Sequence, residues 1–142
     1  MHGEGDALMN ANYRLSVKDF SGPVAVIRVN TLYFDGISDS QLLDITRCYW
    51  NRNRAKAEQC ELVLSAYRGE VKGVYIAEKW VDGRLIKVDP KLNPPRLNDP
   101  GFGFVGHRAP DSIRNKYIGC SVRGLFRKGD QCPLRVFNLP NA

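Results

Sequence analysis

The sequence LVLSAYRGEVKGVYI, residues 62–76, contains two runs of apolar and β-branched residues joined by Arg68-Gly69-Glu70. Such runs are typical of strands, and the glycine permits the left-handed backbone conformation of a tight turn. We therefore predict an antiparallel hairpin here. An Asp82-Gly83 turn signal follows, so residues 85–88 are predicted to extend the hairpin into a meander.

Other apolar runs on both sides of the hairpin are expected to complete the sheet. Residues 24–29, Val-Ala-Val-Ile-Arg-Val, are nearly all apolar and mostly β-branched, which is typical of a central strand. Shorter strands are expected at residues 13–17, 102–106 and 134–137. Residues 89–101 contain four prolines and are expected to form a long surface loop.

A helix is predicted to begin at Ser38, because Gln41 follows three residues later as in a capping box. The apolar stripe of this helix extends to Trp50. We expect the helix to bring Arg47, Tyr49 and Trp50 together.

A second, short helix is predicted at residues 110–118, with Gly119 just past its end. Strands and helices alternate irregularly, without repeats. We predict an α+β fold: a mixed, mostly antiparallel sheet, curled into a partial barrel, with two or three short helices. A length of 142 residues fits one domain, which we place at residues 13–142 after a flexible tail of residues 1–12.

The chain is basic, with 21 Lys and Arg against 15 Asp and Glu and a net charge of +6. The charge is concentrated in two segments. Residues 106–142 hold seven basic residues against two acidic ones, and residues 47–56 hold four basic residues and no acid. Two such segments can converge on one face that binds phosphates.

The four cysteines do not follow a zinc-binding pattern. Eleven residues separate Cys48 from Cys60, and eleven separate Cys120 from Cys132, whereas a zinc knuckle has two to four. We therefore expect reduced thiols and no metal or cofactor. The sequence shows neither a secretory signal nor an apolar run long enough to span a bilayer, so a cytoplasmic protein without membrane contact is predicted.

Three blocks of the sequence carry a family resemblance. The first consists of PVAVIRVN (23–30), DITRCYW (44–50) and RAKAE (54–58). The second is AYRGEVKGVY (66–75), followed by Trp80. The third consists of FVG (104–106), YIGCSV (117–122), KG (128–129) and PLRVFN (133–138).

Together, these blocks resemble the accessory domain that accompanies the GIY-YIG nuclease domain in bacterial relatives of the LEM-domain-associated nucleases, and that also occurs alone. The resemblance extends over residues 23–138. It implies a nucleic-acid-associated module of DNA or RNA processing or genome defence. It also implies a PUA-like pocket of the sort that reads modified bases.

Two short motifs imitate the nuclease signature itself. Gly73-Val74-Tyr75 and Tyr117-Ile118-Gly119 approximate GIY and YIG, and Arg123 follows, but 41 residues separate the two motifs. In the GIY-YIG family, the motifs lie close together on neighbouring strands, and a downstream glutamate holds the metal. The last glutamate here is Glu78, so a metal site for phosphodiester hydrolysis lacks its anchor. A remote GIY-YIG-like endonuclease is kept only as an alternative.

We predict a non-catalytic module that binds DNA or RNA and holds one base, modified or unmodified, in an aromatic pocket. The residues expected to face phosphates are Arg47, Arg52, Arg54, Arg123, Arg127, Lys128 and Arg135. The residues expected to line the pocket are Trp50, Trp80 and Phe104, and His107 is expected to contact a phosphate or a base. The other alternative is an accessory subunit that recruits a separate nuclease, with incidental charge.

Overall fold

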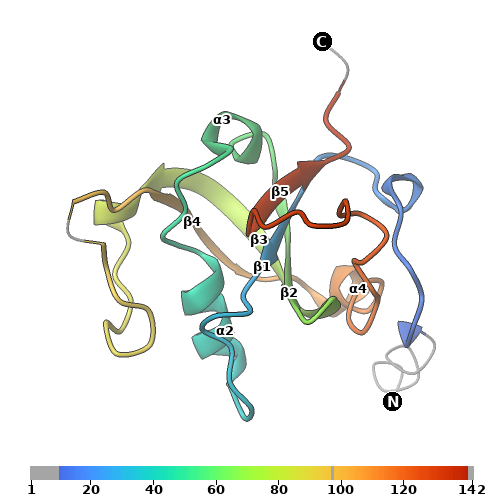
Figure 1. Ribbon diagram of the computed structural model, residues 1–142, viewed down its shortest axis with the longest axis horizontal. Coiled ribbons are helices and arrows are strands. Elements are labelled where there is room, and N and C mark those ends of the chain that lie inside the picture. The colour runs from blue at the N-terminus through green and yellow to red at the C-terminus, as the bar shows by residue number, and fades with distance from the viewer. Residues whose placement is uncertain (1–9, 97, 141–142) are drawn as a thin grey trace.

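The sheet is the centre of the fold. The computed structural model describes residues 10–96 and 98–140. Its strands are β1 (Val24–Arg28), β2 (Leu62–Tyr67), β3 (Glu70–Asp82), β4 (Phe102–Arg108) and β5 (Leu134–Phe137). They form one open sheet in the order β4-β3-β2-β1-β5 (Figure 1), in which β1 and β2 are parallel and the other neighbours are antiparallel. The predicted α+β fold with a mixed, mostly antiparallel, partly curled sheet is confirmed.

The helices of the described residues are short. They are the 3-10 turns η1 (Val17–Asp19) and η2 (Gly83–Leu85) and the helices α2 (Asp39–Thr46), α3 (Arg54–Ala57) and α4 (Asp111–Arg114). α2 begins directly after Ser38, as predicted, and α4 lies within the predicted range 110–118. None of the helices in this part of the chain is long and apolar enough to cross a membrane.

Both faces of the sheet are buried, which explains the unbroken apolar sequence of β1. Ala25 and Ile27 pack with α2 and α3 in one core. Val24 and Val26 point to the opposite face and pack with residues 109–122 in a second core. Side chains that alternate along one strand therefore serve two cores.

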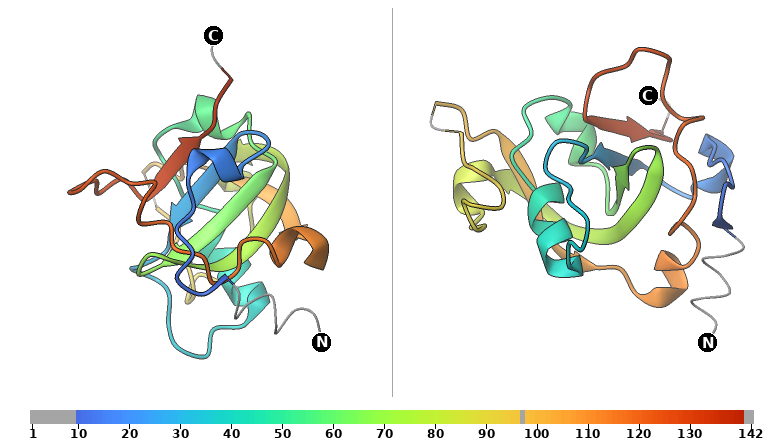
Figure 2. Two further views of the ribbon diagram at one scale, coloured as in Figure 1. Left: turned by 90° about the vertical axis from the view of Figure 1, so that its right-hand side faces the viewer. Right: turned by 60° about the horizontal axis from the view of Figure 1, so that its bottom comes forward.

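The predicted hairpin is present, with Arg68 and Gly69 at positive φ values of 49° and 82° in its turn. β3 continues well beyond the hairpin, to Asp82. Its pairing with β4 shifts register between Ala77 and Lys79, and such an irregularity bends a strand (Figure 2). The bend lets β3 pair with β2 along one half and β4 along the other.

The strand predicted at residues 85–88 is wrong. The Asp82 side chain accepts a hydrogen bond from the backbone N–H of Arg84 (2.9 Å) and caps η2 instead of starting a hairpin turn. A Cβ atom at Gly83 would lie 2.1 Å from the carbonyl oxygen of Pro100, so the glycine permits close backbone packing here. The chain then leaves the sheet, and Leu85 is 71% exposed.

The strand predicted at residues 13–17 is also wrong. It is reduced to one bridge between Arg14 and Ser121, because η1 begins at Val17. Of the predicted tail, residues 1–9 lie outside the described residues. The next residue, Asn10, is held in place, since its side-chain amide donates to the carbonyl oxygens of residues 115 (2.6 Å) and 118 (3.0 Å).

The cap of α2 provides a stability test. Ser38 Oγ accepts from the N–H of Gln41 (3.1 Å), and Gln41 Oε1 accepts from the N–H of Ser38 (3.0 Å). Ser38→Ala removes one of these bonds and is expected to lower the free energy of unfolding by about 1 kcal/mol in urea denaturation. Ser112→Ala, at an exposed serine in α4, is the matched control. Equal effects of the two substitutions would contradict the capping role.

Candidate nucleic-acid interface

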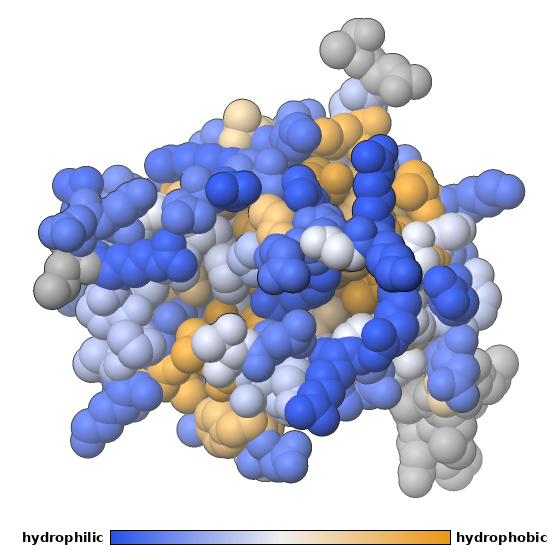
Figure 3. All heavy atoms as spheres, in the orientation of Figure 1, coloured by the Kyte–Doolittle hydropathy of each residue, from blue (hydrophilic) through white to orange (hydrophobic). Residues whose placement is uncertain are grey.

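The two basic segments of the sequence meet in one groove. It is an open cavity of about 660 Å³ between the start of α3 and the segment that leads into β5. We call it the basic groove; its lining is Arg52, Lys56, Leu125, residues 127–132, Arg135, Val136 and Phe137. Figure 3 shows the face that carries β5, with strongly hydrophilic side chains beside apolar surface. The predicted convergence of the two segments is therefore present.

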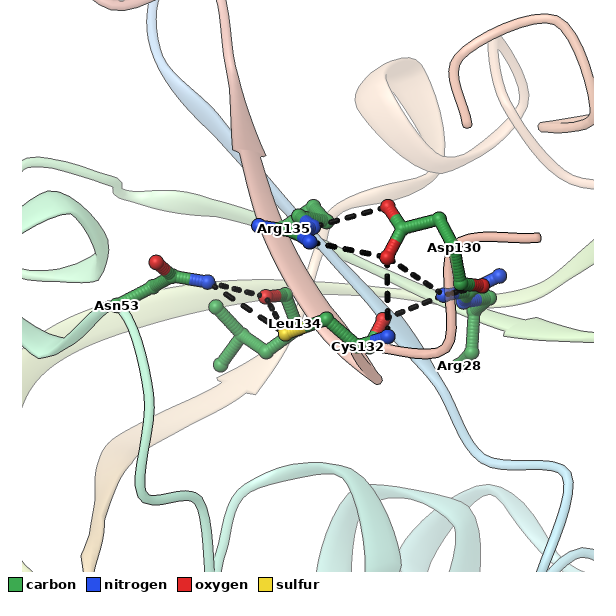
Figure 4. A network of polar contacts seen from close by, with 6 residues as sticks. All are labelled: Arg28, Asn53, Asp130, Cys132, Leu134 and Arg135. Carbon is green, nitrogen blue, oxygen red and sulfur yellow. Dashed lines mark hydrogen bonds and ion pairs between the residues drawn. The ribbon is translucent and has the colours of Figure 1, made fainter. Parts of the chain in front are cut away.

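Asn53 fixes the first segment against β5. Its side-chain amide donates to the carbonyl oxygen of Leu134 (2.8 Å), and its backbone adopts a left-handed conformation (φ 68°) just before α3 (Figure 4). Asn tolerates this conformation better than most residues. Arg52 and Lys56, on either side of Asn53 in sequence, are thereby held at the groove.

Asp130 is the one acidic residue in the groove lining, and arginines neutralise it. Its carboxylate accepts two hydrogen bonds from Arg135 (2.9 and 3.0 Å) and one from the N–H of Cys132 (3.0 Å), and it lies 3.8 Å from the Arg28 guanidinium (Figure 4). The Arg135 hydrogen bonds, followed by that of Cys132, lower the pKa of Asp130 to about 2. The paired carboxylate therefore repels an approaching anion little.

Arg28 organises the segment before β5 from inside the sheet. Its guanidinium donates to the carbonyl oxygens of Asp130 (2.8 Å) and Cys132 and lies 4.0 Å above the ring centre of Phe126. These contacts shape the chain around Arg127 and Lys128. Within residues 10–96 and 98–140, four groove cations form no ion pair: Arg52, Lys56, Arg127 and Lys128.

The wall of the groove between the cations is partly apolar. Leu125, Val136 and Phe137 contribute to it, and each is half-buried. The Phe137 ring packs edge-on against Phe126, with ring centres 5.5 Å apart. Cations beside a partly exposed aromatic ring are typical of surfaces that bind single-stranded nucleic acid.

Three arginines predicted to face phosphates lie outside the groove lining. Arg47 pairs with Asp44 (2.7 Å) and donates to the carbonyl oxygen of residue 87 (3.0 Å). Arg54 lies 3.7 Å from Glu58. Arg123 donates to the carbonyl oxygen of residue 68 (2.8 Å), at the turn of the β2–β3 hairpin. Membership in a basic segment therefore did not determine which way each side chain points.

The predicted pocket formed by Trp50, Trp80 and Phe104 is not present. Phe104 is completely buried, because it faces the core under α2 and α3. Trp80 packs on the Phe104 ring (5.1 Å between centres) and donates its indole N–H to the carbonyl oxygen of Cys60 (2.9 Å). Trp50 lines a different cavity, and its indole N–H donates to the carbonyl oxygen of Thr46 (2.7 Å).

His107 does not line the basic groove. It lies on β4, at the edge opposite β5, and its side chain is exposed. Its Nδ1 atom is 3.0 Å from Glu78 Oε1. His107 is therefore not among the residues that line the basic groove with Arg52 and Arg127.

The motifs that imitate the nuclease signature serve the cores. Tyr75 belongs to the core on one face of the sheet and Tyr117 to the core on the other, and both are buried. Burial raises the pKa of both phenols. Among residues 10–96 and 98–140, no three His, Cys, Asp or Glu side chains are grouped so that they could hold a metal ion.

The residues predicted to face phosphates or to line the pocket did not include Arg28, Asp130 and Phe137, and they included Lys56 only as a member of the basic run. A signal for Arg28 exists, because it is the charged residue in an otherwise apolar central strand and must find a partner there. Lys56 belongs to the basic run at residues 47–56. No local pattern identifies Phe137 as part of the groove wall.

The pKa of Asp130 provides a test of the network. The folded-state pKa of about 2 lies below the ordinary value, so Asp130 stabilises the fold above about pH 4 and loses this effect as the pH falls towards 2. Asp130→Asn is expected to lower the free energy of unfolding near pH 6, and the difference from the unmodified protein should shrink towards pH 2. Asp35→Asn, at an exposed position, is the control. A difference that does not change with pH would contradict the assigned pairing.

The fold and the groove define an α+β domain with a basic, partly aromatic groove. No protein-family model, curated protein or solved structure matches this chain. The family resemblance described above therefore stays an expectation.

Proposed function

We propose that this protein binds DNA or RNA through the basic groove and does not cleave it. The observation that carries this proposal is the convergence of five cations from two distant segments: Arg52, Lys56, Arg127, Lys128 and Arg135. Each cation that neutralises a phosphate releases condensed counterions, which favours binding of a polyanion regardless of sequence.

The state of the groove cations supports a role in binding. Arg52, Lys56, Arg127 and Lys128 are exposed, so a phosphate can reach them without breaking an ion pair among the described residues. Arg135 is held in one orientation by its two hydrogen bonds to Asp130. A pre-oriented guanidinium loses less side-chain entropy when a phosphate binds.

The proposal of binding without cleavage is supported by the chemistry of the groove. A metal-dependent phosphodiesterase needs carboxylates that are free to hold the metal. The carboxylate in the groove lining, Asp130, is occupied by Arg135 and Cys132 and lies beside Arg28. The nuclease alternative gains no support from this arrangement.

Titration of fluorescent oligonucleotides tests the proposal. Single-stranded and duplex DNA and RNA are titrated at two salt concentrations, and the oligonucleotides are then analysed on a denaturing gel. We expect dissociation constants below about 10⁻⁴ M at low salt, weaker binding at high salt and intact oligonucleotides. Binding weaker than this limit would favour the accessory subunit that recruits a nuclease, and cleavage would favour the nuclease alternative.

A further inference from the structure

A second cavity is lined by residues that follow or precede groove residues in sequence. Its volume is about 320 Å³, at the lower end of the range for small-molecule pockets. We call it the Trp50 cavity; the lining residues that matter for the argument are Arg28, Thr31, Tyr49, Trp50, Asn93 and Pro133. Two aromatic side chains and a few polar groups in a small hollow are typical of a site for a planar heterocycle.

The Trp50 ring is oriented without any ligand. Its indole N–H donates to the carbonyl oxygen of Thr46 (2.7 Å), in the last turn of α2. The side chain is half-buried, so part of its surface stays accessible from the cavity. A fixed aromatic ring can stack on a base with little further loss of conformational entropy.

Asn93 provides a buried polar group without a full set of partners. The residue is 4% exposed, and its amide nitrogen donates to the carbonyl oxygens of Asp44 (3.0 Å) and Cys48 (2.8 Å). These two acceptors fix the orientation of the amide. Its Oδ1 atom accepts no hydrogen bond from the described residues. Because Asn93 lines the cavity and Oδ1 is not among the fully buried unpaired atoms of the described residues, this acceptor is available to a ligand that brings an N–H donor, as the edges of nucleobases do.

The cavity and the groove share short stretches of chain. Cys132 lines the groove and Pro133 lines the cavity. Trp50 lines the cavity, and Arg52, two residues later, lines the groove. Arg28 lines the cavity and bonds to the groove segment at Asp130. Neighbouring residues of the same chain segments therefore line both the groove and the cavity.

We propose that the Trp50 cavity receives one unstacked nucleobase of a strand that is bound in the basic groove. The inference rests on the proposed function and adds a base site to it. The base stacks beside Trp50 and Tyr49 and donates an N–H to Asn93 Oδ1. Stacking and a hydrogen bond to the base edge are the means by which proteins hold flipped or single-stranded bases.

A substitution that fills the cavity from outside tests this assignment. Thr31 lines the cavity, and its side chain is exposed, so Thr31→Trp can block the cavity without disturbing a core. Ser112→Trp, which adds the same side chain at an exposed position that lines neither the cavity nor the groove, is the matched control. Each protein is titrated with a single-stranded oligonucleotide and with an abasic oligonucleotide that has the same number of phosphates.

We expect the unmodified protein and Ser112→Trp to bind the intact strand about tenfold or more tightly than the abasic strand. Thr31→Trp should bind both strands with the affinity of the abasic strand. Equal affinities for the two strands in the unmodified protein, or a preference that survives in Thr31→Trp, would overturn the base site and leave the groove intact.

Two further outcomes also decide the matter. If the unmodified protein binds neither strand, both the proposed function and the base site fail. This outcome differs from failure of the base site alone, in which the abasic strand still binds. A free nucleoside monophosphate that binds as tightly as the intact strand would overturn the assignment to a base within a strand.

Discussion

Simultaneous charge reversal at Arg52 and Arg127 is expected to weaken duplex binding by roughly 60-fold near 0.1 M salt, because each lost phosphate contact costs about eightfold there. The two residues come from the two basic segments and line the same groove. Arg52→Glu and Arg127→Glu are combined, and affinity is measured by fluorescence anisotropy. Both side chains are exposed, so the fold should be unaffected.

The matched control changes the net charge by the same amount elsewhere. Lys91 and Lys116 are exposed and do not line the basic groove. Lys91→Glu with Lys116→Glu should weaken binding only a fewfold, through the long-range field. Equal losses in the two double variants would show that total charge, and not the groove, determines binding.

Phe104→Ala is expected to lower the free energy of unfolding by about 3–5 kcal/mol. The ring is completely buried in the core under α2 and α3, where it contacts Trp80, and its removal leaves a cavity. Urea denaturation measures this loss. Phe34→Ala, at a position that is 40% exposed, is the control and should change stability by about 0.5 kcal/mol or less.

The same variant tests the role of Phe104 in binding. The folded fraction of Phe104→Ala should bind oligonucleotides with unchanged affinity, because the ring touches neither the basic groove nor the Trp50 cavity. A variant of unchanged stability with weakened binding would restore Phe104 to the interface.

Local sequence patterns were sufficient to predict the elements whose conformation is determined by residues close together in the sequence. The apolar, β-branched runs around Arg68-Gly69-Glu70 predicted the hairpin, and the nearly apolar run at residues 24–29 predicted a central strand, which is β1 in the structure. The Ser38 and Gln41 pair predicted the start of α2.

The elements that depend on distant contacts could not be predicted in this way. Asp82-Gly83 is a turn signal, but the carbonyl oxygen of Pro100, far along the chain, determines how closely the backbone packs at Gly83. α3 has four residues, which is too short for a helical pattern to show in the sequence. β3 extends past the hairpin because β4 is present to pair with it.

The basic groove was predicted in its charge and in four of its cations, Arg52, Arg127, Lys128 and Arg135, but not in its aromatic residues. Charge is additive along a segment, so the convergence of the two basic segments could be expected. The direction of one side chain is set by its partners, and these are often remote: Arg123 binds the carbonyl oxygen of residue 68. Whether an aromatic side chain lies in the core or at the surface depends on how the strands and helices pack against each other. Composition could not reveal that Phe104 is buried while Trp50 borders a cavity.

The salt dependence of duplex binding is the most direct test of the central claim that the basic groove binds phosphates. With up to five groove cations engaged, the logarithm of the association constant should fall with the logarithm of salt concentration with a slope of about −4. The Arg52→Glu, Arg127→Glu variant should show a slope that is shallower by about two. A flat salt dependence in the unmodified protein, or identical slopes in the two proteins, would contradict the claim.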